Sequence, residues 1–308
     1  MIGRFLAFAL LFAGLFFPPT APSAQELVTV PVAENIWAIV GPKGQRTPAN
    51  LGNNATFGLV VTGEGAVLID PGGSFKGAEA LDVEIRKVTD KPVTIVINSG
   101  GQDHRWLGNG YWKAKGAKII ASEAAVADHK ARAGMQMEGL KQFLGDRLAG
   151  TEPVYADTTF REESRLNFGG VDLLIRHSGQ AHTPGDSYVW LPGRKVMFAG
   201  DIVYTERLLG VGPQSHAGSW IKAFEAMAAH APEHLVPGHG RPTTLARAKV
   251  DTLDYLIHLR TRVKALIDKG GTLAEAPKLD QAAFARLEQF DSLAPRNAAQ
   301  VFTEMELE

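Results

Sequence analysis

The sequence of 308 residues contains no cysteine. This absence excludes disulfides, thiolate metal ligands and a thiol nucleophile. The sequence also lacks an excess of either charge, because 32 basic and 33 acidic residues leave a net charge of −1. No block of like charge stands out, so we expect no nucleic-acid partner.

Long apolar runs are absent except at the start of the chain. The run Phe5 to Phe17 follows the basic residue Arg4 and precedes the small, breaker-rich stretch Pro18 to Ala24. This order is typical of a secretory signal, so we expect a signal peptide over 1–24 and a mature domain over 25–308. The run is shorter than the roughly 20 residues of a membrane span, although a retained N-terminal anchor is the alternative. We therefore expect a periplasmic or secreted protein without stable membrane association after cleavage.

Short apolar strands alternate with helical stretches in both halves of the chain, and no linker divides them. This mixture predicts a layered α/β domain. The expected strands are Leu27–Val30, Ile36–Val40, Phe57–Val61, Ala66–Ile69, Val93–Ile97, Lys118–Ala121, Val171–Arg176, Tyr188–Leu191, Lys195–Phe198 and His234–Val236. The expected helices are Ser74–Val88, His104 towards Lys115, a polar stretch to about Leu148, Trp220–Ala229, Leu245–Ile267 and Asn297–Leu307, with Asn297 as N-cap.

Five side chains that suit a borderline divalent ion lie at strand ends or in glycine-rich turns. They are Asp103, His104, His182, Asp201 and His239. A turn after a buried strand can hold a side chain rigidly while leaving it accessible, and zinc accepts both imidazole and carboxylate ligands. A lone histidine in such a place is more often structural, so the indication comes from the five together.

These settings, in this order, resemble the metallo-β-lactamase superfamily. The resemblance includes the segment Leu68 to Gly72 after an expected hairpin and Val96 to Asn98 before the expected metal loop. It implies a four-layer αββα sandwich of two similar halves, with the metal site at one edge between the sheets. It also implies hydrolysis of a small-molecule substrate, which the fold alone does not specify.

The metal loop departs from the family pattern His-x-His-x-Asp-His. Ser99 and Gly101 replace its first two histidines, while Asp103 and His104 are retained, and His104 is the first histidine in the chain. The resemblance places the two missing histidines in the first metal site, with His182 and Asp201. That site therefore keeps only two of its four ligands.

The second metal site is complete by the same resemblance, with Asp103, His104, Asp201 and His239 as ligands. We therefore expect one Zn²⁺ per chain, because two strong ligands rarely hold zinc against water. A partly ordered first site and a metal-free, decayed site are the alternatives. Two facing carboxylates, Asp103 and Asp201, would repel each other, and a divalent ion would remove that conflict.

The resemblance predicts a metallo-hydrolase acting on an ester, thioester, lactone or lactam. Asp103, His182 and Asp201 are the expected catalytic residues, with His182 as a base or as a donor to the oxyanion. Asp201 stands where lactamases carry cysteine or serine, which resembles the thioesterase and glyoxalase II side of the family. A non-catalytic protein that captures a small ligand, or an accessory protein of a redox or sulfur system, is the alternative. The pattern selects no particular substrate and no oligomeric state.

Overall fold

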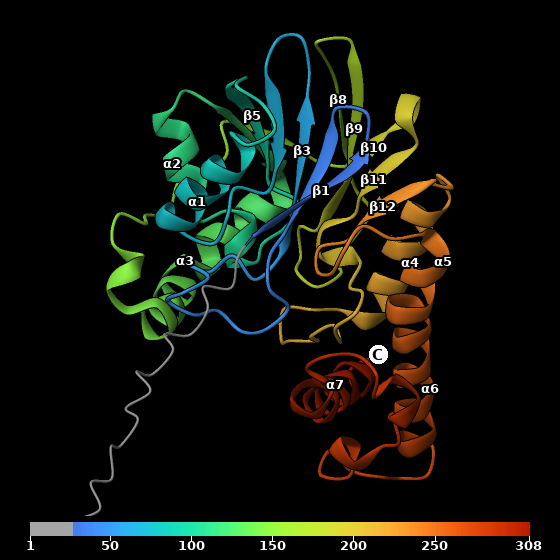
Figure 1. Cartoon of the computed structure of the whole chain (residues 1–308). Coiled ribbons are helices and arrows are strands. Elements are labelled where there is room, and N and C mark those ends of the chain that lie inside the picture. Colours follow the sequence, from blue (N-terminus) through green and yellow to red (C-terminus); the bar gives the residue numbers. More distant parts are fainter. Residues whose placement is uncertain (1–26) are drawn as a thin grey trace, which may run out of the picture.

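Two β-sheets form the centre of the molecule (Figure 1). The computed structural model describes residues 27–308, so the expected signal peptide lies outside the described part of the chain. The seven-stranded sheet has the order β1 (Val28–Ala33), β2 (Ile36–Val40), β3 (Thr56–Val61), β4 (Ala66–Ile69), β5 (Val93–Ile97), β6 (Lys118–Ser122) and β7 (Thr158–Phe160). The five-stranded sheet has the order β12 (His234–Val236), β11 (Val196–Phe198), β10 (Ser187–Leu191), β9 (Val171–His177) and β8 (Glu163–Phe168).

Helices cover the outer face of each sheet. The seven-stranded sheet carries α1 (Phe75–Ile85), α2 (Asn109–Ala114) and α3 (Glu123–Leu144) on its side of the molecule. The five-stranded sheet carries α4 (Ala217–Ala228), α5 (Leu245–Ala248) and α6 (Asp254–Ile267), and α7 (Phe290–Met305) packs against α6 at one end (Figure 1). The predicted four-layer αββα sandwich is therefore confirmed. Within 27–308, no helix is both long enough and apolar enough to span a bilayer.

The strands alternate their side chains between two apolar cores. In β4, Val67 and Ile69 belong to the core between the sheets, whereas Ala66 and Leu68 belong to the core beneath α1 and α2. Because both faces of these strands are buried, their sequences read as continuous apolar runs. The sheets also approach closely at Gly58 in β3, where a Cβ atom would overlap the ring of Phe198 from the other sheet.

Three expectations about elements were wrong. The strands β7 and β8 were not expected; β7 has three residues, and β8 is polar and alternately exposed. The expected helix from His104 begins as a short 3-10 turn, and α2 starts only at Asn109. The last helix begins at Phe290, so Asn297 is not its N-cap but a fully buried residue inside it.

Candidate active site

The candidate site lies where loops follow the C-terminal ends of strands from both sheets. The segment from Ser99 to His104 follows β5, and Asp201 follows β11. His239 comes three residues after β12 ends at Val236. Rigid, buried strands therefore position side chains from distant parts of the sequence at one edge of the sandwich.

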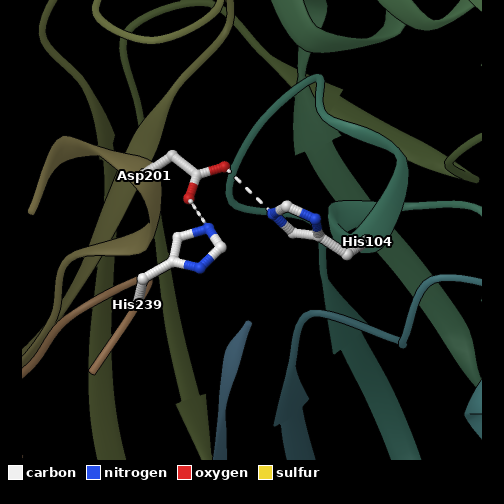
Figure 2. A group of neighbouring side chains, drawn as sticks. All are labelled: His104, Asp201 and His239. Carbon is white, nitrogen blue, oxygen red and sulfur yellow. Dashed lines mark hydrogen bonds and ion pairs between the residues drawn. The ribbon is translucent and has the colours of Figure 1, made fainter. Parts of the chain in front are cut away.

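Two histidines and one carboxylate converge at this edge (Figure 2). The Nε2 atom of His104 lies 3.3 Å from Oδ2 of Asp201, and the Nε2 atom of His239 lies 3.3 Å from Oδ1. All three residues are buried, and the His239 ring stacks on Tyr204 at a centroid distance of 4.5 Å. Burial lowers the pKa of His239 well below the usual histidine value, so its imidazole is neutral.

The buried residue Arg105 donates hydrogen bonds to both oxygens of Asp201. Its Nη2 and Nε atoms donate to the two Asp201 oxygens at 2.7 and 3.1 Å, and its Nη1 donates to Asp70 at 2.8 Å. Burial alone would raise the pKa of Asp201, but the charge of Arg105 and the interactions with His104 and His239 together outweigh this effect and hold that pKa well below the usual range. Asp201 is therefore an ionised carboxylate in a fixed orientation.

Asp103 contacts the ring nitrogen of His104 that does not face Asp201, with its Oδ1 atom 3.2 Å from Nδ1 of His104. Its carboxylate accepts two hydrogen bonds from Arg46, one of them from Nε at 2.5 Å. Burial alone would raise the pKa of Asp103, yet the charge of Arg46 together with the hydrogen bonds from His104 and Arg46 outweighs this effect and lowers that pKa. Each carboxylate thus has its own guanidinium, so their mutual repulsion is offset without an ion. Asp103 lies outside the group of donor atoms that converge.

His182 lies in the wall of the adjoining cavity. Its Nδ1 atom is 2.9 Å from the carbonyl oxygen of Gly210. A carbonyl only accepts, so Nδ1 carries the hydrogen and Nε2 keeps its lone pair. Burial lowers the pKa of His182 to about 4, which keeps the ring neutral at pH 7. His182 is therefore able to accept a proton or bind a metal through Nε2.

The two positions where the family has histidines serve the structure of the loop. Ser99 donates from both its amide and its hydroxyl group to the carboxylate of Asp70, each at 2.7 Å. A Cβ atom on Gly101 would overlap the carboxylate of Asp128, which is paired with Arg132. The space that an imidazole would need at Gly101 is therefore filled.

The converging donors fit one zinc ion. One donor atom from each of the three residues lies within 4.8 Å of the other two, and zinc accepts both imidazole nitrogen and carboxylate oxygen as ligands. Three protein ligands with an open fourth position is the usual arrangement of a catalytic zinc site. His104, Asp201 and His239 are the residues that could hold the ion.

A cavity of about 260 Å³ opens beside this group of three residues. His104, His182 and His239 lie in its wall together with three arginines, Arg46, Arg207 and Arg296. Its other lining residues are Gln45, Asn54, Gln102, Tyr204, Gly210, Val211, Gly212, Pro213, Gln214, Leu293 and Asn297. Among the residues of 27–308 that line it, none is an aspartate or a glutamate. The cavity is therefore polar and positively charged.

The sequence did not indicate the arginines of the site. Arg46 lies between β2 and β3, Arg207 follows β11, and Arg296 lies in α7, so no spacing in the sequence connects them. Arg105 did give a signal, because it directly follows the Asp103–His104 pair. A cation next to two candidate ligands could have been recognised as their counter-charge.

Comparison with known proteins agrees with this geometry. Residues 52–239 match the family model described as the metallo-beta-lactamase superfamily. A metallo-beta-lactamase type 2 from Elizabethkingia meningoseptica is 26% identical over 191 residues, which cover 60% of this chain and 68% of that protein.

Solved structures share the fold at low sequence identity. A metallo-beta-lactamase from Pontibacter korlensis has a TM-score of 0.62 at 21% identity, over 75% of this chain and 99% of its own. An inverting sec-alkylsulfatase from Pseudomonas sp. has a TM-score of 0.67 at 18% identity, over 90% of this chain but 50% of its own. The similarity to the alkylsulfatase structure extends over more of this chain than the similarity to the lactamase structure.

Proposed function

Because this chain belongs to the metallo-β-lactamase superfamily, we propose that it is an exported, metal-dependent hydrolase of a small-molecule substrate. We propose one zinc ion per chain, held by His104, Asp201 and His239. The bond that it cleaves is an ester, thioester, lactone or lactam. The expected signal peptide supports export, and the observation that carries the proposal is the convergence of three metal donors beside a cavity.

The chemistry follows from the state of each side chain. When bound, the ion supplies a Lewis acid that polarises the scissile carbonyl and acidifies a water molecule. His182 has an unprotonated Nε2 atom in the cavity wall, which suits a general base that takes a proton from the attacking water. The same tautomer has no Nε2 hydrogen to donate, so it favours the base over the oxyanion donor. Arg105 keeps Asp201 ionised and oriented.

A non-catalytic protein that binds small ligands is the second candidate. The observation that favours it is the neutralisation of Asp103 by Arg46 and of Asp201 by Arg105. These ion pairs neutralise both carboxylates with side chains of the protein itself, so the site does not need a metal ion in order to fold. The two candidates differ in whether a bound metal turns over a substrate.

A substrate panel with metal control separates the two. The purified mature chain would be assayed with 4-nitrophenyl esters, a thioester, a lactone, a β-lactam and 4-nitrophenyl sulfate, before and after chelation and with zinc restored. We expect hydrolysis of at least one substrate, lost on chelation and recovered with zinc. His239→Ala should abolish it, whereas His234→Ala, at an exposed residue of the strand leading to His239, should not. Metal-independent binding without any turnover would support the second candidate instead.

A further inference from the structure

We propose that the cavity binds an oxyanion of the substrate, a carboxylate, sulfate or phosphate group, between Arg207 and Arg296. This inference rests on the proposed function in one respect, that the cavity is the substrate site. Binding of the anion itself requires no turnover.

Arg207 is partly buried and has only weak contacts. Its Nε atom is 3.4 Å from the carbonyl oxygen of Leu208, and its Nη1 atom is 3.5 Å from Nδ1 of His239. Its guanidinium lies over the ring of Tyr204, 5.8 Å from the ring centroid. In the described range, 27–308, no carboxylate lies within the 4.0 Å of an ion pair with Arg207. Its side chain therefore has donors available for a ligand.

Two carboxylates whose backbones neighbour that of Arg207 are engaged elsewhere. Glu206 accepts from Lys43 at 2.9 Å, and Glu288, whose backbone pairs with that of Arg207, is bound to the same lysine at 2.6 Å. Burial lowers the pKa of Arg207, and the nearby charge of Arg46 lowers it further. The folded chain thus places a cation here without supplying its counter-ion, although removing a charge from water without a partner is costly.

Arg296 is presented to the cavity by α7. Leu293, Arg296 and Asn297 all line the cavity, at positions three and four residues apart that share one face of a helix. Asn297 fixes this face: its Nδ2 donates to the carbonyl of Leu209 at 2.8 Å, and its Oδ1 accepts from the amide of Val211 at 2.8 Å. The helix that carries Arg296 is therefore anchored to the loop that contains Gly210.

That loop also contacts the proposed base. The carbonyl of Gly210, between the two residues that Asn297 binds, accepts from Nδ1 of His182. Arg296, the loop and His182 are consequently parts of one connected wall. An anion bound by Arg296 would lie in the same cavity as the proposed catalytic group.

The charge of the cavity leaves two guanidinium groups uncompensated. Arg46 is neutralised by Asp103, but neither Arg207 nor Arg296 has a carboxylate partner within 27–308, and no acidic side chain in that range lines the cavity. A guanidinium offers a planar fork of donors that matches carboxylate, sulfate and phosphate oxygens. Two such forks in a cavity of about 260 Å³ favour a small anionic substrate over a neutral one.

Part of this anion site comes from outside the shared family region. The family match covers residues 52–239 and includes Arg207. Arg296 lies in α7, beyond the end of the match, and Arg46 lies before its start. The proposed anion site therefore depends in part on a helix that lies outside the matched region.

The first test measures anion binding without turnover. As-purified protein would be titrated calorimetrically with sodium sulfate, sodium phosphate and sodium succinate, at an ionic strength held constant with sodium chloride. We expect at least one anion to bind more tightly than chloride, and Arg207→Gln and Arg296→Gln each to weaken it by about tenfold or more, since about 1.4 kcal/mol corresponds to tenfold. The matched control is Arg165→Gln, at an exposed arginine of β8.

Two variants are compared so that the test does not depend on the folding of Arg207→Gln alone. Arg296 is exposed and makes no ion pair within 27–308, so Arg296→Gln should keep the wild-type melting temperature even if Arg207→Gln does not. The anion that binds best identifies the group, whether carboxylate, sulfate or phosphate. Equal binding by wild type and Arg296→Gln, or no binding beyond that of chloride, would overturn the inference.

The second test uses turnover to compare a charged and a neutral ester. Mono-4-nitrophenyl succinate and 4-nitrophenyl butyrate carry the same leaving group, but only the first has a carboxylate. We expect the ratio of their kcat/KM values to fall about tenfold in Arg296→Gln, mainly through KM of the succinate ester. If neither these esters nor any substrate of the panel is hydrolysed while the variants still lose anion binding, the proposed function fails and this inference stands. An unchanged ratio in Arg296→Gln would contradict the inference and leave the hydrolase proposal intact.

Discussion

Arg105 and Arg207 are the same residue type beside the same group of side chains, yet their surroundings differ. Arg105 is fully buried and donates to Asp70, Asp201 and the carbonyl oxygens of Thr56 and Gly238. Arg207 has no carboxylate partner in the described range and lines the cavity. The partners of a charged group, rather than its residue type, thus separate a structural role from a binding role.

The largest expected effect is that of removing the paired arginine. Arg105→Met would leave Asp70 and Asp201 buried without their counter-charge, because both carboxylates are at most 1% exposed. Loss of one partner of a buried ion pair costs about 3–5 kcal/mol. We expect a decrease of this size in the free energy of unfolding, measured by urea denaturation. A loss below about 1 kcal/mol would show that Arg105 is not the electrostatic support of the site.

The next effect concerns the loop in which serine and glycine replace the family's histidines. Gly101→Ala places a Cβ atom against the carboxylate of Asp128 and should disturb its pairing with Arg132. Overpacking of this kind costs about 1–3 kcal/mol. The control is Gly134→Ala in α3, where a Cβ has nothing within 4 Å, and which should stabilise by up to about 1 kcal/mol. Equal melting temperatures for the two variants would contradict the packing described for Gly101.

A buried group without a partner also appears at His129. Its Nε2 atom lies 2.9 Å from the carbonyl of Gly100 and its ring stacks on Trp106, but its Nδ1 atom has no hydrogen-bond partner among the described residues. Burial lowers its pKa from 6.5 to about 4. As the pH falls from 6.5 towards 4, the unfolded chain takes up a proton that the folded chain does not. His129 therefore lowers the free energy of unfolding over that window.

This dependence can be isolated with His129→Gln, which retains a donor for Gly100. Between pH 6.5 and 5, wild type should lose up to about 1.4 kcal/mol per pH unit more than the variant. The measurement is urea unfolding of both proteins at pH 7, 6 and 5. Parallel pH profiles would indicate that His129 is protonated as easily in the folded chain as in the unfolded one.

The smallest expected effect on stability is that of removing the other arginine of the pair, Arg207. Arg207→Met removes a cation that has no carboxylate partner within 27–308, so we expect a change in the free energy of unfolding of at most about 0.5 kcal/mol, of either sign. Under the same conditions Arg105→Met should be several-fold more damaging. A similar, large loss in both variants would mean that Arg207 supports the fold, and would weaken its assignment to ligand binding.

Most strands, and the convergence of three of the five candidate residues at one edge of the sheets, were predictable because their signals are local. A β-branched run such as Val93–Ile97 indicates a largely buried strand, and that strand places the following loop at the site. The polar strand β8 lacks this signal because alternate residues face solvent. Asn297 has the chemistry of an N-cap, but its side chain binds a loop more than 80 residues earlier in the sequence.

The electrostatics of the site could not be predicted for a related reason. Whether Asp103 faces Asp201 or an arginine depends on how the loop containing Arg46 folds over the sheet edge, and no local pattern encodes that contact. The three arginines of the cavity come from segments that only the tertiary fold brings together. The sequence thus indicated the candidate metal ligands but not the charges around them.

Zinc titration tests the central claim most directly. Chelator-treated wild type, His239→Ala and Asp103→Asn would each be titrated with zinc, with bound metal checked by elemental analysis. Three converging donors predict about one tight zinc per chain, lost in His239→Ala and less weakened in Asp103→Asn, because Asp103 is held by Arg46. Two tight ions per chain, none, or undiminished binding by His239→Ala would contradict the account.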